Sequence, residues 1–157
     1  MTLESWASSR ATRTSMRGNR RTDTKPEIAL RSKLHAVGLR FRKDYRLDLG
    51  DVRVRPDVVF TRAKVVVFVD GCFWHCCPIH GTQPTRNSGY WAPKLARNVE
   101  RDREQDIVLA AHGWRVIRVW EHEPVDDAVQ RVVRAAGGAG AAFARADDDE
   151  GHGGERR

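Results

Sequence analysis

The sequence predicts a single α/β domain in which helices cover a mixed β-sheet. Three patterns indicate this class: apolar residues at helical spacing after residue 24, apolar strand-like runs within residues 52–69, and a further strand at 115–120 between two helical segments. The chain has 157 residues, 40% of them hydrophobic, which is enough for one compact core and not for two.

Residues 1–22 are polar and arginine-rich, so we expect an N-terminal arm that lies outside the core. A helix is expected to begin at Thr24, which suits an N-cap, with Pro26 in the first turn and Glu27 at the capping-box position. Gly38 is expected to end this helix. The apolar residues between these limits recur at roughly helical spacing and are Ile28, Leu30, Leu34 and Val37.

The middle of the chain alternates strands and loops. Residues 52–60 predict a strand interrupted near Pro56, and residues 61–64 a turn. The continuous apolar run at 65–69 is typical of a central strand that is buried on both faces. Residues 71–92 are rich in Gly, Pro, Cys, His and aromatic residues without periodicity, which indicates a functional loop.

The last part of the predicted domain consists of a helix over 92–112, a strand over 115–120 and a short helix over 125–133. Gly113 is expected to end the first of these helices. Beyond residue 135 the chain becomes Gly/Ala-rich and then Asp-rich, so residues 136–157 are predicted to form a disordered tail. The folded domain is therefore expected to span residues 23–135.

The charge of the chain points to an anionic partner. The formal net charge is +7 and the pI is about 9.9, and nucleic acid is the commonest partner of such a protein. The alternative is a basic surface without a function. No apolar run is long enough to span a membrane and Met1–Ser9 lacks a signal core, so we expect an intracellular protein.

The three cysteines are bunched within residues 72–77, which in a reducing compartment favours metal ligation over a disulfide framework. Cys72, Cys77 and His80 form a C-x4-C-x2-H pattern, and structural zinc takes four Cys and His ligands. The best candidate for the fourth ligand is His122, just past a predicted strand. Spacing leaves open whether Cys76 or Cys77 binds and whether His75 competes. The alternative is free thiols beside a surface histidine.

Acidic residues at strand ends suggest phosphodiester chemistry. Asp57 lies at the head of a strand that hairpins into residues 65–70, where a nuclease carboxylate would bind Mg²⁺. Its alternative is a turn aspartate. Asp70 is a second metal candidate, although no lysine follows it in the common acid-x-lysine pattern. His75 is a candidate general acid or base, or only a loop residue.

Two aromatic pairs, Phe73-Trp74 and Tyr90-Trp91, lie in the polar loop region. They either pack into the core or insert between base pairs as apolar wedges.

These motifs occur together in one order that resembles the very short patch repair endonucleases. The order is Arg13-Thr-Ser-Met-Arg17, Thr24–Glu27, Arg55-Pro-Asp57, Asp70-Gly-Cys-Phe-Trp-His75, Asn98-Val-Glu-Arg-Asp102 and Gly113–Glu121, and the resemblance runs from about Ala11 to about Val133. It implies a fold like that of restriction endonucleases over the endonuclease domain, residues 23–135. It also implies a Mg²⁺-dependent enzyme that nicks DNA beside the thymine of a T:G mismatch left by deamination of 5-methylcytosine.

The resemblance assigns roles to individual residues. It makes Asp57 and the backbone carbonyl of Val69 the Mg²⁺ ligands, His75 the catalytic histidine, and Asp102 its orienting partner. Glu27 falls on a family active-site carboxylate, and its alternative role is to close the capping box. The zinc set carries over as Cys72, Cys77, His80 and His122. Asp70 stands where some members have histidine, which keeps it a candidate metal ligand.

The expected DNA contacts follow from the same resemblance. Phe73, Trp74 and Trp91 match the aromatics that wedge beside the mismatch, and Met16 would press from the opposite groove. Arg13 and Arg17 in the arm would neutralise phosphates. The implied partner is double-stranded DNA with a T:G mismatch, with other DNA repair proteins as further candidates. One site cutting one strand needs only a monomer, and the implied location is cytoplasmic and nucleoid-associated.

Three alternatives remain at this point. A related restriction-type endonuclease would cut intact duplex sites. A zinc-containing DNA-binding module would need the basic arm, the aromatics and the zinc, but neither Asp57 nor His75. A redox protein would use the cysteines at 72–77 for thiol chemistry.

Overall fold

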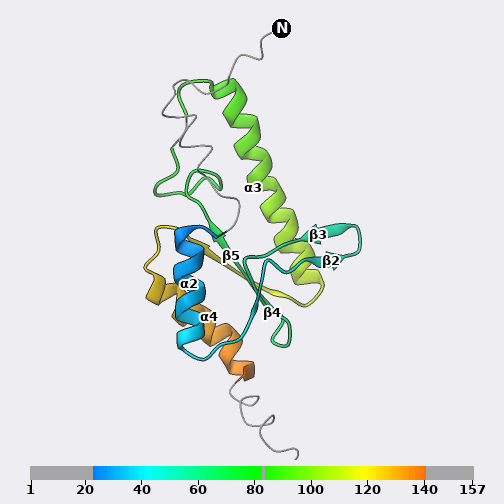
Figure 1. Ribbon diagram of the computed structural model, residues 1–157. Helices are drawn as coiled ribbons and strands as arrows, with labels where there is room; N and C mark the ends of the chain where they lie inside the picture. The colour runs from blue at the N-terminus through cyan, green and yellow to red at the C-terminus, as the bar shows by residue number, and fades with distance from the viewer. Residues whose placement is uncertain (1–22, 83, 141–157) are drawn as a thin grey trace, which may run out of the picture.

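The computed structural model describes residues 23–82 and 84–140, and element labels follow Figure 1. The helices are α2 (Lys25–Ala36), α3 (Ser88–Ala111) and α4 (Val125–Gly140). The strands are β1 (Arg42–Lys43), β2 (Leu47–Leu49), β3 (Val52–Val54), β4 (Val58–Phe60), β5 (Val65–Asp70) and β6 (Arg115–Trp120). The mixed α/β class predicted from the sequence is confirmed.

The main sheet has four strands in the order β1-β4-β5-β6. β4 pairs antiparallel with β5 through a tight turn, with Phe60 opposite Val65, as expected for a hairpin. β5 and β6 are parallel, with Val65 opposite Arg115 and Asp70 opposite Trp120. The connection from β5 to β6 contains the loop after Asp70 and the whole of α3. Because the two strands are parallel, this loop begins at the same edge of the sheet at which β6 ends.

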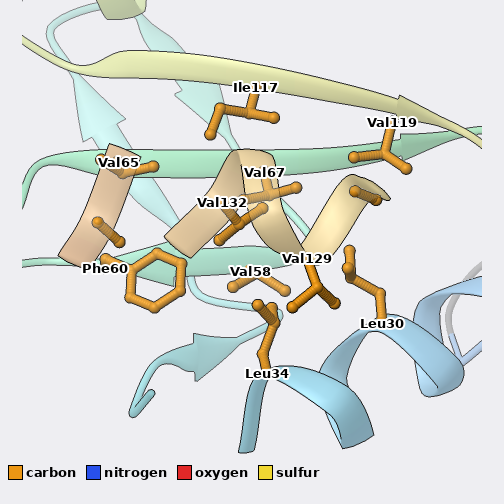
Figure 2. Close-up of a cluster of buried hydrophobic side chains, with 12 residues drawn as sticks. Leu30, Leu34, Val58, Phe60, Val65, Val67, Ile117, Val119, Val129 and Val132 are labelled. Carbon is orange, nitrogen blue, oxygen red and sulfur yellow. The ribbon is translucent and has the colours of Figure 1, made fainter. Parts of the chain in front are cut away.

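One face of the sheet is covered by α2 and α4. Figure 2 shows how Leu30 and Leu34 of α2 and Val129 and Val132 of α4 point toward the strands. The strand residues that they meet are Val58, Phe60, Val65, Val67, Ile117 and Val119. Because side chains alternate along a strand, every second residue of β5 and β6 faces these helices.

The other face carries the intervening residues. Val66 and Phe68 of β5 pack there with Leu109 of α3 and with Leu47 and Val54 of the β2–β3 hairpin. Figure 1 shows that hairpin beside the end of the long helix α3. β5 is thus buried on both faces, as its continuous apolar run predicts.

Several boundaries differ from those expected. Residues 52–60 form two strands, β3 and β4, which belong to different sheets, with Pro56 between them. The helix expected over 92–112 begins at Ser88, because Trp91 already makes a helical hydrogen bond to the carbonyl of Asn87. Gly89 and Pro93 conceal this start in the sequence. Strands β1 and β2 are not predicted by the sequence patterns.

The helix expected over 125–133 continues to Gly140, into the segment predicted to be disordered. Ala128, Val132 and Ala136 repeat at four-residue spacing and are buried on one face, so α4 keeps packing beyond residue 133. Ala136 is buried, but a single alanine within a Gly/Ala-rich segment does not stand out in the sequence as part of an apolar helix face. Residues 141–157 lie outside the described part of the chain.

In α2, the four apolar residues of the expected periodic set divide into two groups. Leu30 and Leu34 are fully buried, whereas Ile28 and Val37 are about half exposed. The expected limits at Thr24 and Gly38 are confirmed. Within the described residues, no helix combines the length and the apolar character needed to cross a membrane.

Candidate active site and metal cluster

Asp57 lies immediately before β4, beside the last residues of β5 and at the opposite end of the strand pair from the hairpin turn. Its backbone amide donates to the carbonyl of Val67 (3.1 Å), and its carboxylate accepts a hydrogen bond from the amide of Val69 (2.7 Å). Pro56 precedes it and is fully buried, so the backbone enters the strand in one fixed direction. The structure therefore places the carboxylate of Asp57 against the amide of Val69, the residue whose backbone carbonyl the family resemblance pairs with Asp57 as a Mg²⁺ ligand.

The environment of Asp57 disfavours its negative charge. The pKa of Asp57 is raised to about 6, first by burial and then by the nearby carboxylates of Glu27 and Asp70. The Val69 amide and the charge of Arg31 lower the pKa but only partly offset this effect. Acidic groups gathered in a partly buried site form an oxygen-rich set of the kind that binds Mg²⁺, and a divalent cation would relieve their repulsion.

Glu27 closes the start of α2. It is 5% exposed, and its two oxygens accept hydrogen bonds from the amide of Asp23 (2.8 Å) and the hydroxyl of Thr24 (3.0 Å). The Thr24 hydroxyl makes no cap hydrogen bond to the helix. The reciprocal capping box expected of Thr24 and Glu27 is therefore not formed, although Glu27 still binds the chain at the helix start, and the same carboxylate contributes to the negative charge around Asp57.

His75 pairs with Asp102. Its Nδ1 lies 2.5 Å from Asp102 Oδ2 and 3.7 Å from Asp70 Oδ1. Burial opposes protonation, but the hydrogen bond to Asp102 and the charges of Asp70 and Asp102 raise the pKa of His75 above its usual value. This carboxylate–imidazole pair has the arrangement expected for a general acid or base whose ring is held in one orientation. His75 therefore does not belong to the cysteine cluster.

Arg118 is a residue of this region that the sequence reasoning missed. Its guanidinium joins the end of β5 to α3, with both oxygens of Asp70 at 3.0 Å and Asp106 at 2.8–3.1 Å. The signal was an arginine in the middle of the apolar strand Arg115–Trp120, which at a half-buried position needs acidic partners.

The four predicted zinc ligands come together. One ligand atom from each of Cys72, Cys77, His80 and His122 lies within 4.8 Å of the other three. The Cys72 sulfur lies 3.1 Å from Nδ1 of His122, and the Cys77 sulfur lies 3.7 Å from the same atom. His122 follows β6 and reaches the loop after β5 because the two strands are parallel neighbours.

The donor set fits zinc. Tetrahedral zinc separates ligand atoms by about 3.3–3.8 Å, given metal–ligand bonds of about 2.0–2.3 Å. The observed separations, from 3.1 Å to at most 4.8 Å, lie on both sides of this range. Burial and the neighbouring Cys77 raise the pKa of the Cys72 thiol to about 11, so a thiolate at Cys72 is unfavourable unless a cation lies beside it. Of the adjacent cysteines, only Cys77 belongs to the cluster, while Cys76 has a left-handed backbone with φ 53°.

The loop that carries these ligands is closed tightly. The Gly81 amide donates to the carbonyl of Cys77 (2.8 Å), and a Cβ at Gly81 would lie 2.4 Å from that oxygen. A side chain at position 81 would force the loop open, so only glycine permits this closure.

The predicted DNA-facing aromatics form one cluster. Ring centroids lie 5.1 Å apart for Phe73 and Trp74, 5.4 Å for Phe73 and Trp91, and 5.8 Å for Trp74 and Trp91. Trp91 is 5% exposed, whereas Phe73 and Trp74 are half-buried. Both alternatives considered for these rings are therefore represented: Trp91 is packed inside, and the other two rings retain accessible surface.

A charged hollow adjoins this cluster on the first half of α3. Its volume is about 740 Å³, and its lining contains three cations, Lys94, Arg97 and Arg101, and two carboxylates, Glu100 and Glu104. The ammonium group of Lys94 lies 5.5–5.6 Å from the ring centres of Trp74, Tyr90 and Trp91. Cations beside aromatic faces suit a nucleic-acid backbone with exposed bases. The sequence reasoning missed these cations, although their spacing of three to four residues puts them on one helix face.

Three predicted DNA contacts, Arg13, Met16 and Arg17, lie outside the described residues. The remaining predicted site residues gather around the end of β5. His75 and Asp102 meet Asp70 there, Asp57 meets Val69, and the cysteine cluster follows directly along the chain.

Comparison with known proteins identifies the relatives of this chain. The family described as DNA mismatch endonuclease Vsr matches residues 7–80. A type II nicking enzyme, V.NaeI of Lentzea aerocolonigenes, is 63% identical over 119 residues, which cover 75% of this chain and 72% of that protein. A second, V.XorIIP of Xanthomonas oryzae, is 45% identical over 68% of this chain and 76% of its own length.

The DNA mismatch endonuclease Vsr of Escherichia coli is 39% identical over 115 residues, which cover 71% of this chain and 70% of that enzyme. Matches of this identity and coverage exclude chance similarity of a few motifs. The non-catalytic alternative is therefore not retained, and the redox alternative has no support. The chain belongs to the Vsr family of DNA mismatch endonucleases and is a DNA endonuclease.

Proposed function

We propose that this endonuclease nicks one strand of duplex DNA beside the thymine of a T:G mismatch, in a reaction that depends on Mg²⁺. The observation that carries the proposal is the assembly of two groups at the end of β5: the Asp57 carboxylate on the Val69 amide, and the His75–Asp102 pair. These groups supply an oxygen ligand for a cation and a group that can move a proton, the two requirements for hydrolysis of a phosphodiester.

Asp57 and the backbone carbonyl of Val69 would hold the Mg²⁺ ion. When bound, the ion neutralises charge that develops on the phosphate and favours ionisation of the attacking water. Asp57 is prepared for this role because the Val69 amide fixes its orientation and burial leaves its charge poorly solvated. Glu27 adds a third carboxylate nearby while it binds the chain at the start of α2.

His75 would transfer a proton at its Nε2, because its Nδ1 is already engaged by Asp102. The hydrogen bond to Asp102 selects one tautomer and one ring orientation. The amide of His75 donates to the carbonyl of Gly71 (3.1 Å), and the Asn98 side chain donates to the carbonyl of Trp74 (3.2 Å), so the loop is fastened on both sides of the ring.

Mismatch selection would rest on the aromatic cluster. Phe73 and Trp74 would insert beside the mismatch, with buried Trp91 as the platform behind them. A T:G mismatch stacks less well than a Watson–Crick base pair, so the duplex costs less to open at the mismatch. In residues 1–22, we propose a DNA-binding arm in which Arg13 and Arg17 contact phosphates and Met16 presses from the other groove.

The fold itself supports a relationship to restriction endonucleases. In this proposal residues 23–135 form the endonuclease domain, and the packing of α4 extends it to Ala136. The acidic residues of the sheet lie at the edge where β4 begins and β5 ends. Zn²⁺ would bind at Cys72, Cys77, His80 and His122 as a structural ion that fastens the loop after Asp70. One such domain contains all the proposed groups, so a monomer would suffice.

The test is a nicking assay on labelled duplexes that differ only in one base pair, T:G or T:A, with and without Mg²⁺. The proposal predicts cleavage of the thymine strand of the T:G duplex only, and only with the metal. Asp57→Asn should abolish nicking, while the matched substitution Asp51→Asn at the exposed turn after β2 should retain it. Metal-independent nicking, or equal nicking by Asp57→Asn, would contradict the assignment.

The same assay examines the one remaining rival, an endonuclease for intact duplex sites. Equal cleavage of the T:A and T:G duplexes would favour that rival and would leave the roles of Asp57 and His75 unchanged. Substrate choice and chemistry are thus decided by separate comparisons.

A further inference from the structure

We propose that Arg118 is a positioning residue that determines which of two carboxylates engages His75. His75 Nδ1 has two acidic neighbours, Asp102 at 2.5 Å and Asp70 at 3.7 Å. A single N–H can donate fully to only one of them. The arrangement around Arg118 explains why the partner is Asp102.

Arg118 first occupies the competitor. Its Nη1 donates to both oxygens of Asp70 at 3.0 Å, and the Asp70 side chain is 5% exposed. A buried carboxylate with this cation in place has little capacity left for the imidazole. It is also unsuited to the role of a second metal ligand, which the sequence left open for Asp70.

Arg118 then fastens the preferred partner. Its Nε and Nη2 bind the carboxylate of Asp106, and Nη2 also donates to the backbone carbonyl of Asp102 (3.3 Å). These contacts tie the turn of α3 that carries Asp102 to the middle of β6. The guanidinium centre itself lies 4.5 Å from the ring centre of Phe68, opposite it on β5, so its position is set by the sheet register.

Lysine could not perform both tasks. The guanidinium fork reaches Asp70 and Asp106 in different directions at once, whereas an ammonium group is a single point charge on a flexible stem. Without the fork, Asp70 would be a buried carboxylate without its cation, 3.7 Å from the imidazole, and would compete for its proton. The histidine ring would then leave the orientation that Asp102 imposes.

The inference rests on the proposed catalytic role of His75, so the experiment has one readout with DNA and one without. The variants are Arg118→Leu, Arg118→Lys and the double variant Asp70→Leu/Arg118→Leu. The matched control is Arg131→Leu. Arg131 lies on α4, donates to the backbone carbonyl of Arg118 (2.8 Å) and to Glu123 (2.6 Å), and touches neither carboxylate beside His75.

The first readout is the downfield proton resonance of the His75 Nδ1–Asp102 hydrogen bond, assigned with His75→Gln and recorded at a single pH without DNA. We expect this resonance to be lost or shifted in Arg118→Leu and Arg118→Lys and retained in Arg131→Leu. The double variant should recover it in part, because the competing carboxylate is gone while the contacts of Arg118 with Asp106 and the Asp102 carbonyl are still missing. This variant also replaces a buried charged pair by apolar groups, so it is the one to use if Arg118→Leu does not fold.

The second readout is the single-turnover nicking rate and the affinity for whichever duplex the wild-type protein cuts. Arg118→Leu should lower the rate on the order of a hundredfold, as misplacement of a catalytic group does, with the dissociation constant changed less than about twofold. The double variant should nick at least about tenfold faster than Arg118→Leu. If no duplex is cut, the proposed function fails, and the resonance alone decides the role of Arg118.

Two results would overturn the inference. One is an unchanged resonance in Arg118→Leu, whatever the nicking rate. The other is a double variant in which the resonance shows no recovery at all relative to Arg118→Leu, because removal of Asp70 would then have had no effect on the partner of His75.

Discussion

Removing the charge of Asp57 should stabilise the protein while it abolishes nicking. In the folded protein the pKa of Asp57 is raised from 3.8 to about 6, mainly by burial. At pH values below the pKa of the unfolded state, the Asp57 carboxyl is neutral in both the folded and the unfolded protein, so no charge has to be buried on folding. Between the two values the folded state binds more protons than the unfolded state, so stability falls as pH rises, and above about 6 the whole cost is present.

The size of this cost follows from the shift. A rise of roughly two pKa units corresponds to about 3 kcal/mol, at about 1.4 kcal/mol per unit. Asp57→Asn keeps the shape and an oxygen that accepts from the Val69 amide, but that hydrogen bond loses its charge assistance. We therefore expect about 1–3 kcal/mol of stabilisation at pH 8 and almost none at pH 4.

The assay is urea unfolding in Mg²⁺-free buffer at several pH values, with Asp51→Asn as the control for a change of net charge at an exposed position. Added Mg²⁺ should raise the stability of the wild-type protein but not that of Asp57→Asn, because only the former retains the charged ligand. Equal stabilisation at pH 4 and pH 8, or an Asp57→Asn protein that is less stable at pH 8, would refute the reasoning about burial.

If the cysteine–histidine cluster binds zinc as proposed, elemental analysis should find zinc in the purified wild-type protein and little in Cys77→Ser, and full zinc retention would exclude Cys77 as a ligand. Trp91→Ala should lower the free energy of unfolding by about 3–5 kcal/mol, because a buried ring is lost from the aromatic cluster. Trp74→Ala should instead weaken binding to the mismatched duplex on the order of tenfold, and a binding isotherm that matches the wild-type curve would contradict the wedge role. Leu34→Ala, distant from the site in the α2–α4 core, should cost about 2–5 kcal/mol of stability and leave the nicking rate of the folded protein unchanged.

Much of the candidate site could be predicted from residues that are close in sequence. The segment Asp70–His80 contains three of the four proposed zinc ligands, the histidine and two aromatics, and all lie in the loop after β5. His122 could be added because a strand was expected just before it, and parallel neighbours end at one edge. The choice of Cys77 over Cys76 needed the backbone, since both fit the spacing.

Chain order and local chemistry determined the class of fold, the strand pair β4–β5, the buried central strand, the residues of the cysteine–histidine cluster and the family. These depend on periodicity, on turn residues and on the donor preferences of a metal, which are all local properties. Only the tertiary structure decided that α4 packs as far as Ala136, that Trp91 is buried while Trp74 retains accessible surface, and that Arg118 joins Asp70 to Asp106. Burial and the pairing of distant charges depend on which elements meet in space, and a linear pattern does not contain that information.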